Sequence, residues 1–213
     1  MTHDSGSVLP TRPWLEVLQR VHIYDVTSNN NAVVHHNNKV IENIHWQSPD
    51  LGWIRLNTDG ASKGEDIAGC GRVLRGNNGE WICGFSKGLG ACSAYVAELW
   101  GVFEGLKLAL SHGFLRVELL VDSQVVVNTI SFAKGGSPTG RTLVQNIRRL
   151  LELDWEVKIC HSYREANYCA DALANLACDG GFTMISYEQC PAQVNSIYLA
   201  DVVGAYTPRL VNR

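Results

Sequence analysis

The segment from residue 54 to residue 62, Ile-Arg-Leu-Asn-Thr-Asp-Gly-Ala-Ser, constrains the fold more than any other stretch of the chain. Apolar and polar residues alternate from Ile54 to Asp59, which is the period of a β-strand with two unlike faces. The strand is expected to end in Gly60-Ala61-Ser62, because small side chains let another backbone come close. A carboxylate at a strand end that is followed by a small-residue turn is a candidate seat for a metal ion or a phosphate, or it can simply form an Asx turn.

The periodic segments that follow have an order typical of an α/β fold. Strands and helices alternate after an initial group of three strands, two of which are joined by the hairpin signal Asn78-Gly79. The sequence therefore predicts a five-stranded mixed sheet flanked by helices, with an antiparallel meander of three strands followed by two parallel strands. The expected elements are strands 54–59, 69–75 and 80–86, helix 93–112, strand 115–121, helices 123–132 and 139–153, strand 155–160 and helix 168–178.

Length and composition bound the domain organisation. With 213 residues, 46% hydrophobic and 18% charged, the chain has room for one domain of ordinary size with tails, or two small ones. Residues 1–45 carry weak signals and are treated as a poorly defined N-terminal segment. Residues 46–180 hold the periodic segments, and residues 181–213 are expected to form an extended C-terminal tail.

Charge and cysteine usage narrow the partners and the compartment. A net charge of −3 argues against nonspecific nucleic-acid binding through bulk charge alone, although a local basic patch remains compatible with it. The seven scattered cysteines never form C-x-x-C, which favours reduced thiols over a zinc site or a disulfide framework. Without a signal peptide or a transmembrane run, we expect no membrane partner and an intracellular location, in the nucleus or the cytoplasm.

Four acidic residues fall at the ends of predicted elements. Asp59 and Asp122 end strands, whereas Glu98 and Asp171 lie early in helices. Each has an ordinary explanation as a turn former, a helix cap or a partner of the helix dipole. Together they would gather at one edge of an α/β sheet, where clustered carboxylates repel one another unless a cation lies between them. We therefore predict a site for two Mg²⁺ ions, with Mn²⁺ as an alternative, while Glu104 is expected to be a solvated charge.

Four separated motifs resemble the ribonuclease H type 1 family, and most closely its plant branch, which is associated with non-LTR retroelements. The resemblance covers about residues 46–180, and the motifs occur in the family's order on the expected elements. They read Asn57-Thr58-Asp59-Gly60-Ala61, Ala97-Glu98-Leu99, Val121-Asp122-Ser123 and His161-x-x-Arg164-Glu165-Ala166-Asn167-x-x-Ala170-Asp171.

This resemblance implies an endonuclease that cuts the RNA strand of RNA–DNA hybrids by a two-metal-ion mechanism and leaves 3′-hydroxyl and 5′-phosphate ends. The hybrid is the implied partner, and the chain is expected to be a monomer that was once part of a larger reverse-transcriptase polyprotein. By the same resemblance, the metal-binding and catalytic carboxylates are Asp59, Glu98, Asp122 and Asp171, with His161 assisting proton transfer or product departure. The implied substrate-binding residues are Gly60, Ala61, Ser62, Gln124, Arg164 and Asn167.

Departures from the family pattern keep alternatives open. Ala94-Tyr95-Val96 stand where bacterial members place base-contacting Asn residues, and residues 133–138 replace a basic protrusion. Fewer cations mean weaker, salt-sensitive binding. Lys63, Arg72 and Arg75, together with Arg164, are candidate phosphate contacts or solvated charges. The alternatives to an active nuclease are a catalytically weak or inactive nucleic-acid-binding module derived from a retroelement, and a remnant with no cellular role.

Overall fold

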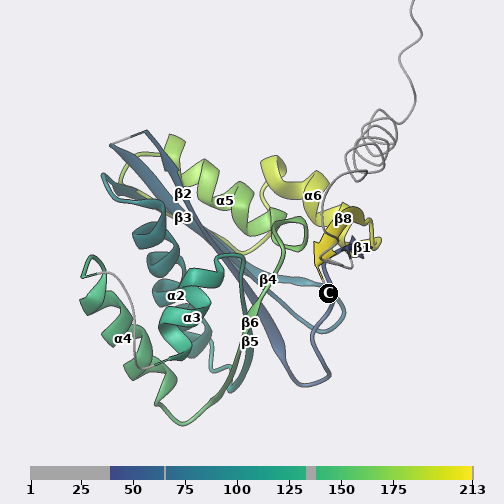
Figure 1. The fold of residues 1–213 in the computed structure, drawn as a ribbon, viewed down its shortest axis with the longest axis horizontal. Helices are drawn as coiled ribbons and strands as arrows, with labels where there is room; N and C mark the ends of the chain where they lie inside the picture. The colour runs from purple at the N-terminus through teal and green to yellow at the C-terminus, as the bar shows by residue number, and fades with distance from the viewer. Residues whose placement is uncertain (1–38, 65, 133–137, 213) are drawn as a thin grey trace, which may run out of the picture. The chain divides into compact units, whose positions relative to one another are not determined.

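The computed structural model describes residues 39–64, 66–132 and 138–212 (Figure 1). Residues 41–209 form one compact unit, which contains every residue of the candidate site. Within the described ranges, none of the helices is long and apolar enough to cross a lipid bilayer. The elements are β1 Lys39–Ile44, β2 Ile54–Lys63, β3 Ile67–Arg75, β4 Trp81–Gly90, α2 Ala94–Ser111, β5 Arg116–Val121, α3 Gln124–Ser131, α4 Arg141–Leu151, β6 Glu156–His161, the 3-10 turn Arg164–Ala166, α5 Tyr168–Asp179, β7 Met184–Tyr187, α6 Ala192–Val202 and β8 Thr207–Asn212.

The main sheet confirms the predicted mixed topology and adds one strand to it. Its strand order is β6-β5-β2-β3-β4-β7. Strands β2, β3 and β4 form the antiparallel meander, and β5 and β6 add in parallel beside β2. The sixth strand, β7, pairs antiparallel with β4. The remaining strands β1 and β8 belong to a separate two-stranded sheet that carries no part of the candidate site.

Helices cover both faces of the main sheet (Figure 1). On one face, α2, α3 and α4 enclose the larger core, in which Leu56, Leu99 and Leu119 are fully buried. On the other face, α5 closes a smaller core around Val73 and Leu173. Each fully buried aliphatic side chain contributes about 1.5–3 kcal/mol to folding. Strand β2 is covered on both faces, so its polar residues Asn57 and Asp59 are buried as well as its apolar ones.

Two glycines let helices lie directly on the sheet. A Cβ atom at Gly60 would lie 2.1 Å from the backbone nitrogen of Glu98, and one at Gly71 would lie 2.2 Å from the backbone nitrogen of Ala174. Any larger residue would push α2 or α5 away from the sheet. The expected end of the strand at residues 60–62 is wrong, because β2 continues to Lys63 and uses its small residues as a packing surface.

The expected extended tail is also wrong, because residues 184–187 join the sheet as β7 and residues 192–202 form α6. Helix α6 contacts α5 and places Val194 in the smaller core. Its Asp201 forms a buried ion pair with Arg75 across 2.7 Å. Arg75 is 1% exposed and is therefore neither a solvated charge nor a phosphate contact. Of the N-terminal segment, residues 1–38 lie outside the described residues.

Two further charges lie where the sequence did not place them. Arg72 is 1% exposed and stacks on the ring of Phe85, and burial lowers its pKa to about 9. Glu104, expected to be solvated, is buried and paired with Lys87 of β4 at 2.7 Å. Among the proposed phosphate contacts on β2 and β3, Lys63 stays exposed. The cationic surface around the site is thus smaller than the sequence suggested.

Candidate metal centre and active site

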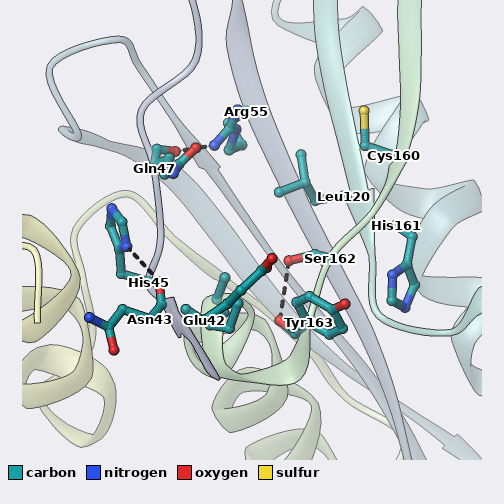
Figure 2. A pocket seen from close by; sticks show the side chains of 12 residues that line it. Glu42, Asn43, His45, Gln47, Arg55, Leu120, Cys160, His161, Ser162 and Tyr163 are labelled. Carbon is teal, nitrogen blue, oxygen red and sulfur yellow. Dashed lines mark hydrogen bonds between the residues drawn. The ribbon is translucent and has the colours of Figure 1, made fainter. Parts of the chain in front are cut away.

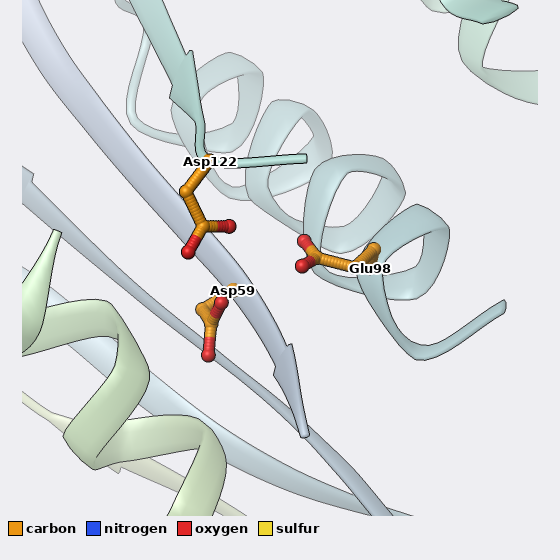
Figure 3. Close-up of side chains that lie close together, drawn as sticks. All are labelled: Asp59, Glu98 and Asp122. Atoms are coloured by element: carbon orange, nitrogen blue, oxygen red, sulfur yellow. The ribbon is translucent and has the colours of Figure 1, made fainter. Parts of the chain in front are cut away.

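Three of the four predicted carboxylates converge at one point of the sheet (Figure 3). Thr58 and Val121 are register partners on the parallel strands β2 and β5, so Asp59 and Asp122 follow them side by side. Glu98 reaches the same point from α2, which packs over Gly60. One ligand atom from each carboxylate lies within 4.8 Å of the others.

Local capping explains why these side chains are available to the site. Ser93 is the N-cap of α2 and its hydroxyl accepts from the backbone N–H of Val96, which starts the helix one turn before Glu98. Ser123 caps α3 in the same way by accepting from Val126. The Asp122 carboxylate is therefore not engaged as the cap of α3.

Burial and mutual repulsion make this cluster unfavourable in its charged form. Burial, followed by repulsion from Asp122 and Asp171, raises the pKa of Asp59 to about 8. Burial together with Asp59 and Asp122 also raises the pKa of Glu98 well above its ordinary value, and burial raises that of Asp122. Oε2 of Glu98 and Oδ1 of Asp122 are buried with no hydrogen-bond partner among the described residues. Clustered oxygen donors with unsatisfied lone pairs fit a hard divalent cation.

The pH dependence of stability should report this repulsion. The folded chain keeps a proton on Asp59 up to about pH 8, whereas the unfolded chain releases it near the ordinary value of 3.8. Unfolding in EDTA therefore releases a proton between about pH 4 and pH 8, and the free energy of unfolding should fall as pH rises through that window. Each unit of pKa shift corresponds to about 1.4 kcal/mol, so a fall of a few kcal/mol is expected.

Urea denaturation at pH 5 and pH 8 in EDTA would measure this fall. Saturating Mg²⁺ should restore stability at pH 8, since a cation that binds the folded chain stabilises it. The Asp59→Asn variant should show a flatter profile. Equal stability at the two pH values in the unsubstituted protein would contradict the raised pKa of Asp59.

The fourth carboxylate, Asp171, lines the same cavity of about 270 Å³ but is held by neighbours. The Arg164 guanidinium donates to its Oδ1 at 2.5 Å, and the Asn175 amide donates to its Oδ2 at 3.3 Å. Asn175 follows Asp171 by one helical turn, and the family motifs did not indicate its contact with Asp171. Helical spacing alone could have indicated it.

His161 lies next to Asp122, outside the carboxylate cavity. It ends β6, its side chain is exposed, and its Nε2 lies 3.1 Å from the carbonyl oxygen of Asp122. Its ring meets that of Tyr163 edge to face. Both side chains line a larger cavity of about 360 Å³ (Figure 2), which holds none of the four carboxylates. The smaller cavity is therefore the better candidate for the reaction centre.

The predicted substrate-binding residues divide into accessible and buried positions. Gly60, Ala61, Ser62 and Arg164 line the carboxylate cavity. Gln124 is exposed at the first residue of α3 and donates to Asn128. Asn167 is 1% exposed, so its side chain is not open to a substrate. Its amide instead bonds to Asn57 and to the carbonyl oxygen of Thr58, and this internal contact corrects the prediction.

Comparisons with known proteins agree with the fold. A family model described as "Reverse transcriptase-like" matches residues 57–177. The chain is 41% identical over 192 residues to an Arabidopsis thaliana protein whose name carries ribonuclease H as a provisional assignment. That match covers 90% of this chain, and the chain spans about a third of the length of that relative, 31%.

Solved structures show the same similarity. Ribonuclease H1 of the halophilic archaeon Halobacterium salinarum is 30% identical, with a TM-score of 0.57, over 61% of this chain and 99% of the other. The ribonuclease H1 called LC11, solved in complex with an RNA/DNA hybrid, is 27% identical, with a TM-score of 0.55, over 60% of this chain and 97% of the other.

Proposed function

Because the chain belongs to the reverse transcriptase-like family and has the ribonuclease H fold, we propose that it cleaves the RNA strand of RNA–DNA hybrids at the carboxylate site. The observation that carries the proposal is the convergence of Asp59, Glu98 and Asp122 within 4.8 Å, with lone pairs left unsatisfied. A fold that gathered these acids with no cation between them would lose stability through their mutual repulsion.

In this proposal Asp59, Glu98 and Asp122 hold divalent cations, with Asp171 at the margin of the same cavity. Two Mg²⁺ ions, or Mn²⁺ in their place, would supply Lewis-acid polarisation of the scissile phosphate and would neutralise its charge. The protein contributes a fixed set of oxygen donors, because the glycine contact at Gly60 holds α2 against β2. The expected products carry 3′-hydroxyl and 5′-phosphate ends.

Residues around the carboxylates would orient the substrate and move protons. When Nε2 of His161 donates to the Asp122 carbonyl oxygen, Nδ1 is the atom that accepts a proton. The backbone at Ala61 and Ser62 lines the cavity where the ribose 2′-hydroxyl would identify the RNA strand. Arg164 would contact a phosphate by exchanging its bond to Asp171 for one to the substrate.

A nucleic-acid-binding module that does not cut is the second candidate. The burial of Arg72 and Arg75 favours this second candidate, because fewer cations remain at the surface to neutralise phosphates. The nearby cations Lys63 and Arg164 are also engaged, with Asp179 and Asp171. Weak hybrid affinity is expected under either reading. That the chain acts inside the cell, in the nucleus or the cytoplasm, and as a monomer stays a prediction.

The deciding experiment is cleavage of an RNA–DNA hybrid, labelled on either strand, by the purified chain at low salt. We expect the RNA strand alone to be cut in Mg²⁺ or Mn²⁺, with no cutting in EDTA and none of a DNA duplex. A 5′-phosphate-dependent exonuclease should then degrade the downstream fragment. Hybrid binding without cleavage by a folded protein in both metals would replace the nuclease proposal with the binding module.

A further inference from the structure

A chain of three buried side chains connects strand β2 to the start of α5. The indole Nε1 of Trp46 donates to Oδ1 of Asn57 at 3.0 Å, and the Asn57 amide donates to Oδ1 of Asn167 at 2.9 Å. The Asn167 amide then donates to the carbonyl oxygen of Thr58 at 3.0 Å. These side chains, called here the 46–57–167 chain, are between 0 and 4% exposed.

The direction of this chain is fixed by chemistry. An indole N–H can only donate, so the oxygen of Asn57 must face Trp46 and its NH₂ group must face Asn167. The oxygen of Asn167 is then the acceptor, and its own NH₂ group is left for the backbone of Thr58. Neither amide can flip without breaking two buried hydrogen bonds, and each bond lost would leave a buried polar group unpaired. The chain therefore holds one arrangement.

Both ends of the 46–57–167 chain are adjacent to predicted site carboxylates. Asn57 and Thr58 immediately precede Asp59 on β2. Asn167 precedes α5, and its carbonyl oxygen accepts from the backbone N–H of Asp171. The close packing at Gly71 sets how near α5 lies to the sheet. The hydrogen bonds of Asn57 and Asn167 constrain a different motion, the sliding of α5 along the face of the sheet. They do so because they join the start of α5 to one position on β2.

The remaining contacts of Trp46 show that it also has a packing role. The Arg75 guanidinium lies over its ring, 4.3 Å from the ring centroid. Trp46 precedes the segment that the family model matches, which begins at residue 57. A residue outside the matched segment thus fixes the side-chain orientation of Asn57, the first residue inside it. The N–H group of Trp46 can be removed separately from its ring, because phenylalanine keeps an aromatic side chain there.

We propose that the 46–57–167 chain is a positioning device that sets Asp171 relative to Asp59 in the carboxylate site, an inference that rests on the proposed function. Asn57, Asn167 and Trp46 would not touch the substrate. Their effect would pass through the two elements that carry the carboxylates. Loss of the central residue should therefore alter metal affinity and turnover more than substrate binding.

The test compares the Asn57→Leu variant with the unsubstituted protein. Leucine keeps the number and branching of the heavy atoms and removes all three hydrogen bonds of the Asn57 amide, to Trp46, to Asn167 and to the carbonyl oxygen of Ala166. Because small misplacements in a catalytic site can cost up to about a hundredfold, kcat should fall about 10- to 100-fold, with KM within about twofold. Calorimetric titration with Mn²⁺ alone should show weaker binding, by about fivefold or more. Both arms are run well below the melting temperature of each variant.

Trp46→Phe serves as the second variant, and Trp155→Phe is its matched control. Trp155 donates its indole N–H to the carbonyl oxygen of Leu150 at 2.8 Å, at a partly buried position away from α5. Trp46→Phe should lower kcat by about two- to fivefold, and Trp155→Phe should leave it unchanged, since only the first breaks a bond linked to Asn167.

The outcomes separate the positioning role from a structural role and from the proposed function. If Asn57→Leu and Trp46→Phe are less stable but keep kcat and Mn²⁺ affinity within twofold of the unsubstituted protein, the positioning role is wrong. If the unsubstituted chain cuts no hybrid, the proposed function fails, and the Mn²⁺ titration still decides the positioning role. Should Asn57→Leu not fold, Trp46→Phe decides alone.

Discussion

Replacing Asp122 by Asn is expected to reduce hybrid cleavage by about a hundred- to a thousandfold, the scale seen when one electrostatic group of a catalytic site is lost. Asparagine keeps the size of the side chain and one oxygen, but it removes the charge that would attract a cation. Asp122 is the least buried of the three converging carboxylates, so the substitution should leave the core intact. The measurement is kcat with a saturating hybrid in Mg²⁺.

The same variant should gain stability in EDTA. The Asp122 charge helps to raise the pKa of both Asp59 and Glu98, so Asp122→Asn removes repulsion that opposes their ionisation in the folded chain. We expect a higher melting temperature for the metal-free variant and a smaller increase on adding Mg²⁺. Asp50→Asn, at an exposed position, should change neither property. Retained cleavage by Asp122→Asn would remove the carboxylate site from the mechanism.

Removing Asp201 is expected to cost about 3–5 kcal/mol of folding stability, because it leaves the buried Arg75 guanidinium without its partner. Nε and Nη1 of Arg75 already lack hydrogen-bond partners among the described residues, so the Asp201 carboxylate is its main compensation. Asp201→Ala should therefore lower the urea midpoint strongly. Its effect on cleavage should come through unfolding, since Asp201 lies outside the carboxylate cavity.

A double substitution tests the cause of this loss. Arg75→Met combined with Asp201→Leu replaces both charges with apolar side chains and should recover much of the stability lost by Asp201→Ala. As a surface comparison, Asp179→Ala breaks the exposed pair with Lys63 and should cost at most about 1 kcal/mol. A cost for Asp201→Ala as small as that for Asp179→Ala would mean that α6 is not anchored by the buried pair.

The sheet topology was predictable from the sequence because its signals are local. Alternation along β2 and the Asn78-Gly79 hairpin specify the meander, and the helix periods that follow leave few ways to connect the remaining strands. The tail was not predictable in this way. Strand β7 has four residues, and α6 buries only Val194 and Asp201, so neither shows a clear apolar period.

The site was predictable where a motif specifies one residue and its element. Asp59, Glu98 and Asp122 were placed by motifs that resemble those of a known family, and the structure brings them together. Arg75 and Asn167 were misplaced because a charge or an amide in a sequence usually indicates the surface. Their burial depends on partners distant in the sequence, Asp201 and Asn57, which no local pattern reveals.

Strand β7 also determines how the protein would behave in solution if it were shortened. The backbone groups of β4 from Gly84 to Lys87 pair with Met184–Tyr187. A fragment cut at residue 180, the boundary that the motif resemblance suggests, would leave those groups open along an edge strand. Unpaired edges of this kind recruit a strand from a second molecule, so the shortened protein would self-associate. Residues 184–187 thus cover a part of the β4 edge that would otherwise be open to a strand from a second molecule.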